Sequence, residues 1–161
     1  MFVELCEVAG WRRGISSVPT ALCAASACEL DKIGRILQTA ARSVGTDIPE
    51  ELQSAYDVNI WLAAIHELGG RWTEVLRWDS LPYEQRPDID FYMTHFRNEQ
   101  LQLVFGEDPS GAENGQAHHL FARQEQRFVD ICTAGRVQNF ERTIGKYLPF
   151  RVKRVFAVEP A

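Results

Sequence analysis

Apolar positions in the first third of the chain recur at the spacing of an amphipathic helix. Between Ile33 and Val44 they stand three and four residues apart, which predicts a helix that follows Pro19 and ends at Gly45. Ser26 with a glutamate three residues later has the pattern of a capping box. This helix therefore either runs unbroken from Thr20 or restarts near Ser26.

A second helix is predicted from Asp47 to Gly69. Asp47 can cap it, Pro49 is tolerated in a first turn, and Glu50 suits the positive end of the helix dipole. Apolar residues between 52 and 68 cover more than one stripe, which indicates a central helix that is buried on several sides.

Strand patterns occur at both ends of the chain. Residues 2–8 alternate between apolar and polar side chains, and residues 150–158 are rich in β-branched and aromatic side chains. We predict a short strand at 2–8 and a final strand at 150–158 that pairs with it. Residues 101–105 also alternate and favour a strand over a continuing helix, whereas residues 71–78 fit either a strand or one helical turn.

The remaining elements follow from turn and cap residues. Pro82 and Pro87 bracket a turn or a short helical piece, and Asp88 can cap a helix that follows it. Residues 106–117 are rich in helix-breaking and strand-breaking side chains, which predicts a mobile loop. Two more helices are predicted after it, one ending near Gly135 and a shorter one after it that Pro149 terminates.

These elements predict an α+β fold in which helices pack on a small, mostly antiparallel sheet. A chain of 161 residues is the size of one domain, so we expect a single globular domain over residues 1–161. Its 45% hydrophobic and 24% charged residues are typical of globular proteins.

Cysteine use and apolar run lengths suggest a compartment. The four cysteines form no C-x-x-C pair and have no histidine at zinc-ligand spacing, so we expect reduced thiols and no structural metal. The N-terminus carries no recognisable signal peptide, and the apolar-rich stretch from Val18 to Ala27 is too short to span a bilayer. The expectation is a cytoplasmic protein that has no cofactor and does not enter a membrane.

Charge is distributed unevenly along the chain. The net charge is −5, which disfavours a general nucleic-acid binder. Residues 1–116 carry −9, whereas residues 117–161 carry +4. Either these charges meet acidic neighbours within the fold, or the basic C-terminal surface recruits a partner of opposite charge.

The predicted interaction surface combines these cations with one tryptophan. Trp11 is followed by Arg12 and Arg13, and an aromatic residue beside arginines is typical of interface hot spots. Arg142 and Lys146 are four residues apart, so on the predicted short helix they would share one face. The candidate binding residues are Trp11, Arg12, Arg13, Arg142, Lys146, Arg151, Lys153 and Arg154.

Other chemistry-bearing residues have simpler explanations. Asp88, Asp90 and His95 could hold a divalent cation, but a solvated helix start explains both aspartates. A histidine pair follows the 106–117 loop with no second ligand at helical spacing. Cys28 would lie in a first helical turn if Ser26 caps it, where its thiol would be activated, but the alanines around it favour close packing as the explanation. The histidine at position 66 fits a hydrogen-bonded core position.

No motif for a P-loop, a dinucleotide fold, a serine hydrolase or a zinc protease is present. We therefore expect a non-catalytic protein that binds another protein, such as a regulator, an inhibitor or an immunity-type partner. The alternative is a small metal-assisted hydrolase or nuclease that uses Asp88, Asp90 and His95. A third hypothesis is nucleic-acid binding by the basic C-terminal region, which would weaken steeply with salt.

Overall fold

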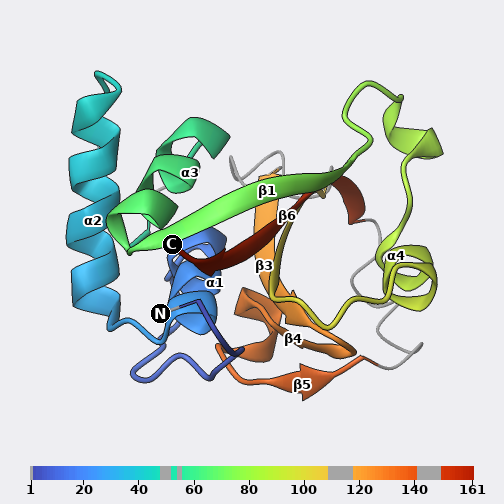
Figure 1. The fold of residues 1–161 in the computed structure, drawn as a ribbon, viewed down its shortest axis with the longest axis horizontal. Helices are drawn as coiled ribbons and strands as arrows, with labels where there is room; N and C mark the ends of the chain where they lie inside the picture. Colours follow the sequence, from blue (N-terminus) through green and yellow to red (C-terminus); the bar gives the residue numbers. More distant parts are fainter. Residues whose placement is uncertain (1, 48–51, 54–55, 109–117, 141–149) are drawn as a thin grey trace.

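The computed structural model describes residues 2–47, 52–53, 56–108, 118–140 and 150–161. Within these residues the chain forms four α-helices and a six-stranded antiparallel sheet, which confirms the predicted α+β fold (Figure 1). The helices are α1 (Ser17–Ser26), α2 (Leu30–Ser43), α3 (Val58–Glu67) and α4 (Ile89–His95), with 3₁₀ helices η1 (Tyr83–Gln85) and η3 (Ile131–Thr133). The strands are β1 (Gly70–Arg77), β2 (Gln102–Glu107), β3 (His118–Gln124), β4 (Arg127–Val129), β5 (Gln138–Asn139) and β6 (Arg151–Pro160). None of the described helices is long and apolar enough to cross a membrane.

The C-terminal strand β6 lies inside the sheet, between β1 and β2. The strand order is β1-β6-β2-β3-β4-β5, and the pairings are antiparallel. Val152, Val155, Phe156 and Val158 are all buried, so both faces of β6 are covered. Branched and aromatic side chains suit such a strand. The predicted final strand is confirmed, but its predicted pairing with the N-terminal segment is wrong.

Residues 2–8 form turns and irregular backbone in place of the predicted strand. The buried side chains here are Phe2, Leu5 and Val8, which are three residues apart and therefore do not follow the two-residue period of a strand. The backbone amide of Leu5 donates to the side-chain oxygen of Gln124 at 2.9 Å, and that of Val8 donates to the carbonyl of Gly135 at 2.8 Å. Residues 2–8 are thus attached to β3 and to the segment after η3 by isolated hydrogen bonds rather than by a strand ladder.

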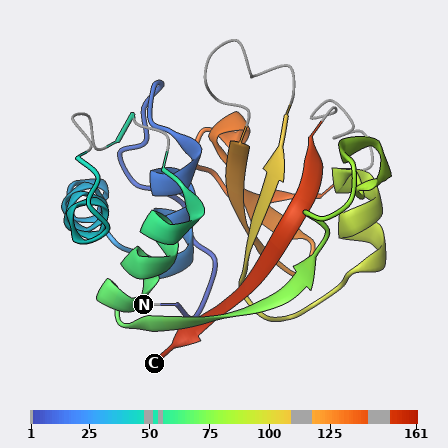
Figure 2. The same ribbon diagram turned by 90° about the horizontal axis from the view of Figure 1, so that it is seen from above.

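Helices cover the two faces of the sheet unequally (Figure 2). Helices α1 and α3 pack on one face, and α2 lies outside them, in contact with both. Helix α4 packs on the other face. The two faces have separate apolar cores, one centred on Trp61 of α3 and Phe156 of β6, the other on Tyr92 of α4 and Val155 of β6.

The first predicted helix is two helices. Helix α1 ends at Ser26, after which Ala27 adopts a left-handed conformation with φ of 56°. The Ser26 hydroxyl donates to the carbonyl of Leu22 at 2.6 Å, within its own helix. The restart is confirmed, but the predicted capping box is wrong, because α2 begins after Glu29 without a side-chain cap.

Helix α3 starts later than predicted. Asp57, rather than Asp47, is its N-cap, and its carboxylate accepts from the backbone amide of Ile60 at 3.3 Å. Residues 48–51 and 54–55 of the predicted helix lie outside the described residues. The predicted end at Gly69 is confirmed, since α3 stops at Glu67 and Gly69 has a φ of +76°.

Between residues 70 and 107 the elements agree with those that the turn, cap and strand patterns predict. Residues 70–77 form β1, which resolves the ambiguity in favour of the strand, and η1 lies between Pro82 and Pro87. The carboxylate of Asp88 accepts from the amide of Phe91 at 2.8 Å and caps α4 as predicted. The predicted strand at 101–105 is β2.

The helix predicted to end near Gly135 is wrong. Residues 118–129 form the hairpin of β3 and β4, with Glu125 at a φ of 54° in its turn. Leu120 and Phe121 are buried on opposite faces of β3, and each belongs to a different apolar core. Two adjacent apolar residues, which suggested a helix, are thus both buried in a strand. At the start of the next predicted helix, residues 138–139 form β5, and residues 141–149 of that helix lie outside the described part of the chain. Residues 109–117 of the predicted mobile loop also lie outside it.

Gly106 of β2 leaves no room for a side chain. A Cβ there would lie 2.2 Å from the carbonyl oxygen of Arg151 and 2.4 Å from the ring of Phe150. We predict that Gly106→Ala lowers the free energy of unfolding by about 3 kcal/mol, because backbone and ring must both shift. Gly45→Ala is the control: it has open space but a φ of +82°, so only about 1 kcal/mol of backbone strain is expected. Urea unfolding of both variants measures the difference; equal losses would contradict the steric explanation.

Candidate functional site

The three predicted cations of β6 meet partners within the protein. The ammonium of Lys153 donates to a carboxylate oxygen of Glu107 at 2.9 Å, and the guanidinium of Arg154 donates to Glu74 at 2.7 Å. Arg151 donates to the carbonyl oxygen of Arg86 at 2.8 Å. These contacts favour the explanation in which acidic neighbours inside the fold compensate the C-terminal charge.

Glu107, at the end of β2, is surrounded by several basic side chains. Its carboxylate lies 3.2 Å from the guanidinium of Arg86 and 3.3 Å from the imidazole of His118, in addition to Lys153. Burial raises the pKa of Glu107, but the hydrogen bond and charge of Lys153, with Arg86 and His118, more than offset this and hold it below its usual range. Glu107 is thus a carboxylate that two cations, Arg86 and Lys153, share.

A hollow of about 240 Å³ adjoins this cluster at the N-terminus of α3. Lys153 and Arg154 contribute positive charge to its lining, and Asp57 and Asp79 contribute negative charge. Asp57 is engaged as the cap of α3, and Asp79 pairs with Arg77. The lining therefore carries no excess of either sign that would select a charged ligand.

Trp11 packs into the junction between α1 and the segment after η3. Its indole nitrogen donates to the hydroxyl of Thr20 at 2.9 Å. A Cβ added to Gly135 would lie 2.9 Å from the Cβ of Trp11, so the backbone of Gly135 packs directly on this side chain. Gly135 also has a φ of +73°, which favours glycine. Trp11 is therefore held in place while part of it stays accessible.

Arginines from two distant segments flank Trp11. Arg12 and Arg13 follow it in sequence, and Arg136 follows the glycine that packs on it; all three are exposed. No carboxylate of the described residues forms an ion pair with any of them. We call Trp11, Arg12, Arg13 and Arg136 the Trp11 surface. Arg142 and Lys146, the other two predicted cations, lie outside the described residues.

The residues of the alternative hydrolase hypothesis serve α4 locally. Asp88 caps the helix, and the ring of His95 stacks on Phe91 with centroids 4.3 Å apart. Among the residues that the structure describes, no group of three or more histidine, cysteine, aspartate or glutamate side chains is arranged to hold a metal ion. Asp88, Asp90 and His95 are accordingly not assembled into such a site.

Cys28 does not occupy the predicted first helical turn, because α2 begins at Leu30. The predicted core position of His66 is wrong, because the residue is exposed at the end of α3; its ring lies 6.4 Å from that of Trp72. Burial raises the pKa of Cys23, which the sequence did not single out, to about 12, so this thiol is not activated.

His119 and Asp130 form a buried ion pair that the sequence did not predict. The imidazole contacts the carboxylate, and the two side chains are 16% and 8% exposed. Asp130 also accepts from the amide of Ile131 and so caps η3. The pairing depends on the β3–β4 hairpin, which local patterns misread as a helix.

No protein-family model matches this sequence. A search of curated proteins also returns no match.

The His119–Asp130 pair predicts a pH-dependent stability. Burial lowers the pKa of His119, but the charge and hydrogen bond of Asp130 outweigh it, so the pKa is raised above its ordinary value. A raised histidine pKa contributes stability that is complete below the unfolded value and is lost as pH rises through the folded value. We predict that His119→Gln costs about 3 kcal/mol near pH 5.5 and progressively less at higher pH. Urea unfolding of both proteins across pH 5.5–9 checks this, and a pH-independent difference would refute it.

Proposed function

We propose that this protein acts by binding another protein, as a regulator, an inhibitor or an immunity-type partner, through the Trp11 surface. The observation that carries the proposal is that three exposed arginines, none of which forms an ion pair with a described carboxylate, flank a half-buried tryptophan. The matching partner has an acidic surface with an apolar recess for the indole.

The held position of Trp11 supports this role. Tryptophan and arginine are the residue types most enriched at interface hot spots. The hydrogen bond to Thr20 and the contact with Gly135 already restrict the indole in the free protein. A side chain restricted in this way loses less conformational entropy on binding than a freely rotating one.

The charge state of the surface supports it further. Arginines that no described carboxylate neutralises keep their field in solution and accelerate encounter with an acidic partner. Lys153 and Arg154 differ, because Glu107 and Glu74 already balance them. We therefore assign partner binding to the Trp11 surface rather than to the cations of β6.

The decisive test is charge reversal with a matched control. We predict that Arg12→Glu combined with Arg13→Glu weakens binding to a copurified partner at least tenfold, since each hot-spot residue contributes more than about 1 kcal/mol. Lys32→Glu combined with Arg35→Glu changes the net charge equally, on two exposed cations of α2, and should leave affinity within about twofold. Calorimetry of the purified pair at low and moderate salt provides the affinities.

Two outcomes would overturn the proposal. One is equal weakening by both double variants, which would mean that only net charge matters. The other is turnover of a substrate that a single substitution abolishes while the variant remains folded. Wild-type binding should also weaken with added salt, because steering by exposed charges is screened.

A further inference from the structure

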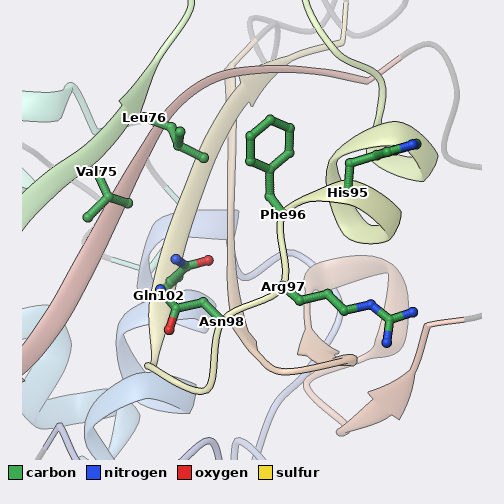
Figure 3. A pocket seen from close by; sticks show the side chains of 7 residues that line it. All are labelled: Val75, Leu76, His95, Phe96, Arg97, Asn98 and Gln102. Carbon is green, nitrogen blue, oxygen red and sulfur yellow. The ribbon is translucent and has the colours of Figure 1, made fainter.

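A hollow of about 270 Å³ lies on the α4 side of the sheet and shares no lining residue with the Trp11 surface (Figure 3). Val75 and Leu76 of β1 form one side, and Phe96, just after α4, faces them across the opening. The amide side chains of Asn98 and Gln102 lie toward its other end. The hollow therefore has an apolar wall and a polar end.

Gln102 presents a hydrogen-bond donor that none of the described residues engages. The residue is only 4% exposed, yet it lines the hollow. Its side-chain oxygen accepts from the hydroxyl of Tyr92 at 2.6 Å, and among the described residues none accepts a hydrogen bond from its side-chain nitrogen Nε2. Asn98 is arranged alike: its side-chain oxygen accepts from the amide of Gln100 at 2.9 Å, which leaves its NH₂ group available. Asn98 is exposed and Gln102 lines the hollow, so both NH₂ groups can donate to a ligand there.

The electrostatic environment of these donors is positive. No acidic residue lines the hollow, and Arg97 at its rim is exposed and forms no ion pair with a described carboxylate. The side chain of Arg97 extends away from the opening in Figure 3, so it can reach a ligand only by changing rotamer. Such rotation is fast for an exposed side chain.

A second arginine lies behind Gln102. Arg123 is the cross-strand neighbour of Gln102 and is completely buried. Its guanidinium lies 4.7 Å above the ring of Tyr92 and donates to the carbonyls of Glu125 (2.7 Å) and Met93 (3.4 Å). Its remaining nitrogen, Nη1, has no partner, and no described carboxylate pairs with it. A buried cation without a counter-ion favours a negative charge nearby.

We propose that this hollow binds an aliphatic carboxylate. The carboxylate accepts from the side-chain amides of Gln102 and Asn98 and pairs with Arg97, while the aliphatic chain covers Val75, Leu76 and Phe96. The same chemistry is offered by a free branched short-chain acid and by the C-terminal leucine of a peptide. The site is independent of the Trp11 surface, so either can fail without the other.

The probes are 4-methylpentanoate and an acetylated tripeptide that ends in leucine with a free carboxylate. Their controls are 4-methylpentanamide and the same peptide with an amidated C-terminus, which keep the shape but lose the charge. Amide chemical shifts in two-dimensional NMR report binding at residues 75–76 and 96–102. For a ligand of about eight non-hydrogen atoms a Kd on the order of 1 mM is expected.

Two variants and one control locate the site. Gln102→Glu keeps the acceptor for the Tyr92 hydroxyl but replaces the donor by a negative charge, so affinity for the carboxylate probes should fall at least tenfold. Arg97→Ala alters only an exposed side chain and should weaken binding about threefold without affecting folding. Arg13→Ala removes an equally exposed cation of the Trp11 surface and should leave the Kd unchanged.

The outcomes separate the two sources and decide the proposal. Tighter binding of the peptide than of the free acid identifies a chain terminus as the ligand; equal or weaker binding of the peptide identifies a small acid. Both support a carboxylate site. The proposal is overturned if neither carboxylate probe causes saturable changes in the amide chemical shifts, even when the probe is added well above millimolar concentration. It is also overturned if the uncharged controls bind equally well, or if Arg97→Ala and Arg13→Ala behave alike.

Discussion

The interior position of β6 is the constraint on which the rest of this fold depends. Residues 151–160 form hydrogen bonds with β1 on one side and with β2 on the other, and they contribute to both apolar cores. The ring of Phe156 is contacted edge-on by Trp61 of α3 at 5.2 Å and by Trp72 of β1 at 5.5 Å. Removal of this strand would separate β1 from the sheet and expose the surface that α3 covers. The cations Lys153 and Arg154 occupy their paired positions because β6 lies between the strands that carry Glu107 and Glu74.

The start or end of a helix could be predicted from the sequence where a single residue determines it. Asp88 caps α4, and Gly69 ends the segment of α3, because a side-chain acceptor or a positive φ is needed at one position only. The failures occur where the partner is distant. Asp47 and Asp57 both have a side chain that can cap a helix, and in the structure Asp57 caps α3. In β3, apolar neighbours face two different cores, so burial on both sides removes the alternation by which a strand is recognised.

The candidate sites were only partly visible in the sequence, because a count of charges does not reveal which of them are compensated. The excess of positive charge after residue 117 includes Lys153, which is matched by Glu107, and Arg123, which is buried without a carboxylate. Trp11 and its two arginines were identifiable from composition. The place of Arg136 beside them depends on the close approach of Gly135, and the orientation of the Gln102 amide depends on the Tyr92 hydroxyl that donates to its oxygen.

The strand order also bears on when the molecule can fold during its synthesis. The chain makes α1, α2, α3 and β1 first, yet the neighbour of β1 is β6, which follows the five other described strands in the sequence. Until residue 160 has left the ribosome, β1 has no partner on either edge, and the apolar surface of α3 lacks Phe156. Unpaired edges and uncovered apolar surfaces are the features by which nascent chains associate wrongly. The sheet order therefore makes folding a late event, and the growing chain carries its greatest risk of aggregation just before the final strand emerges.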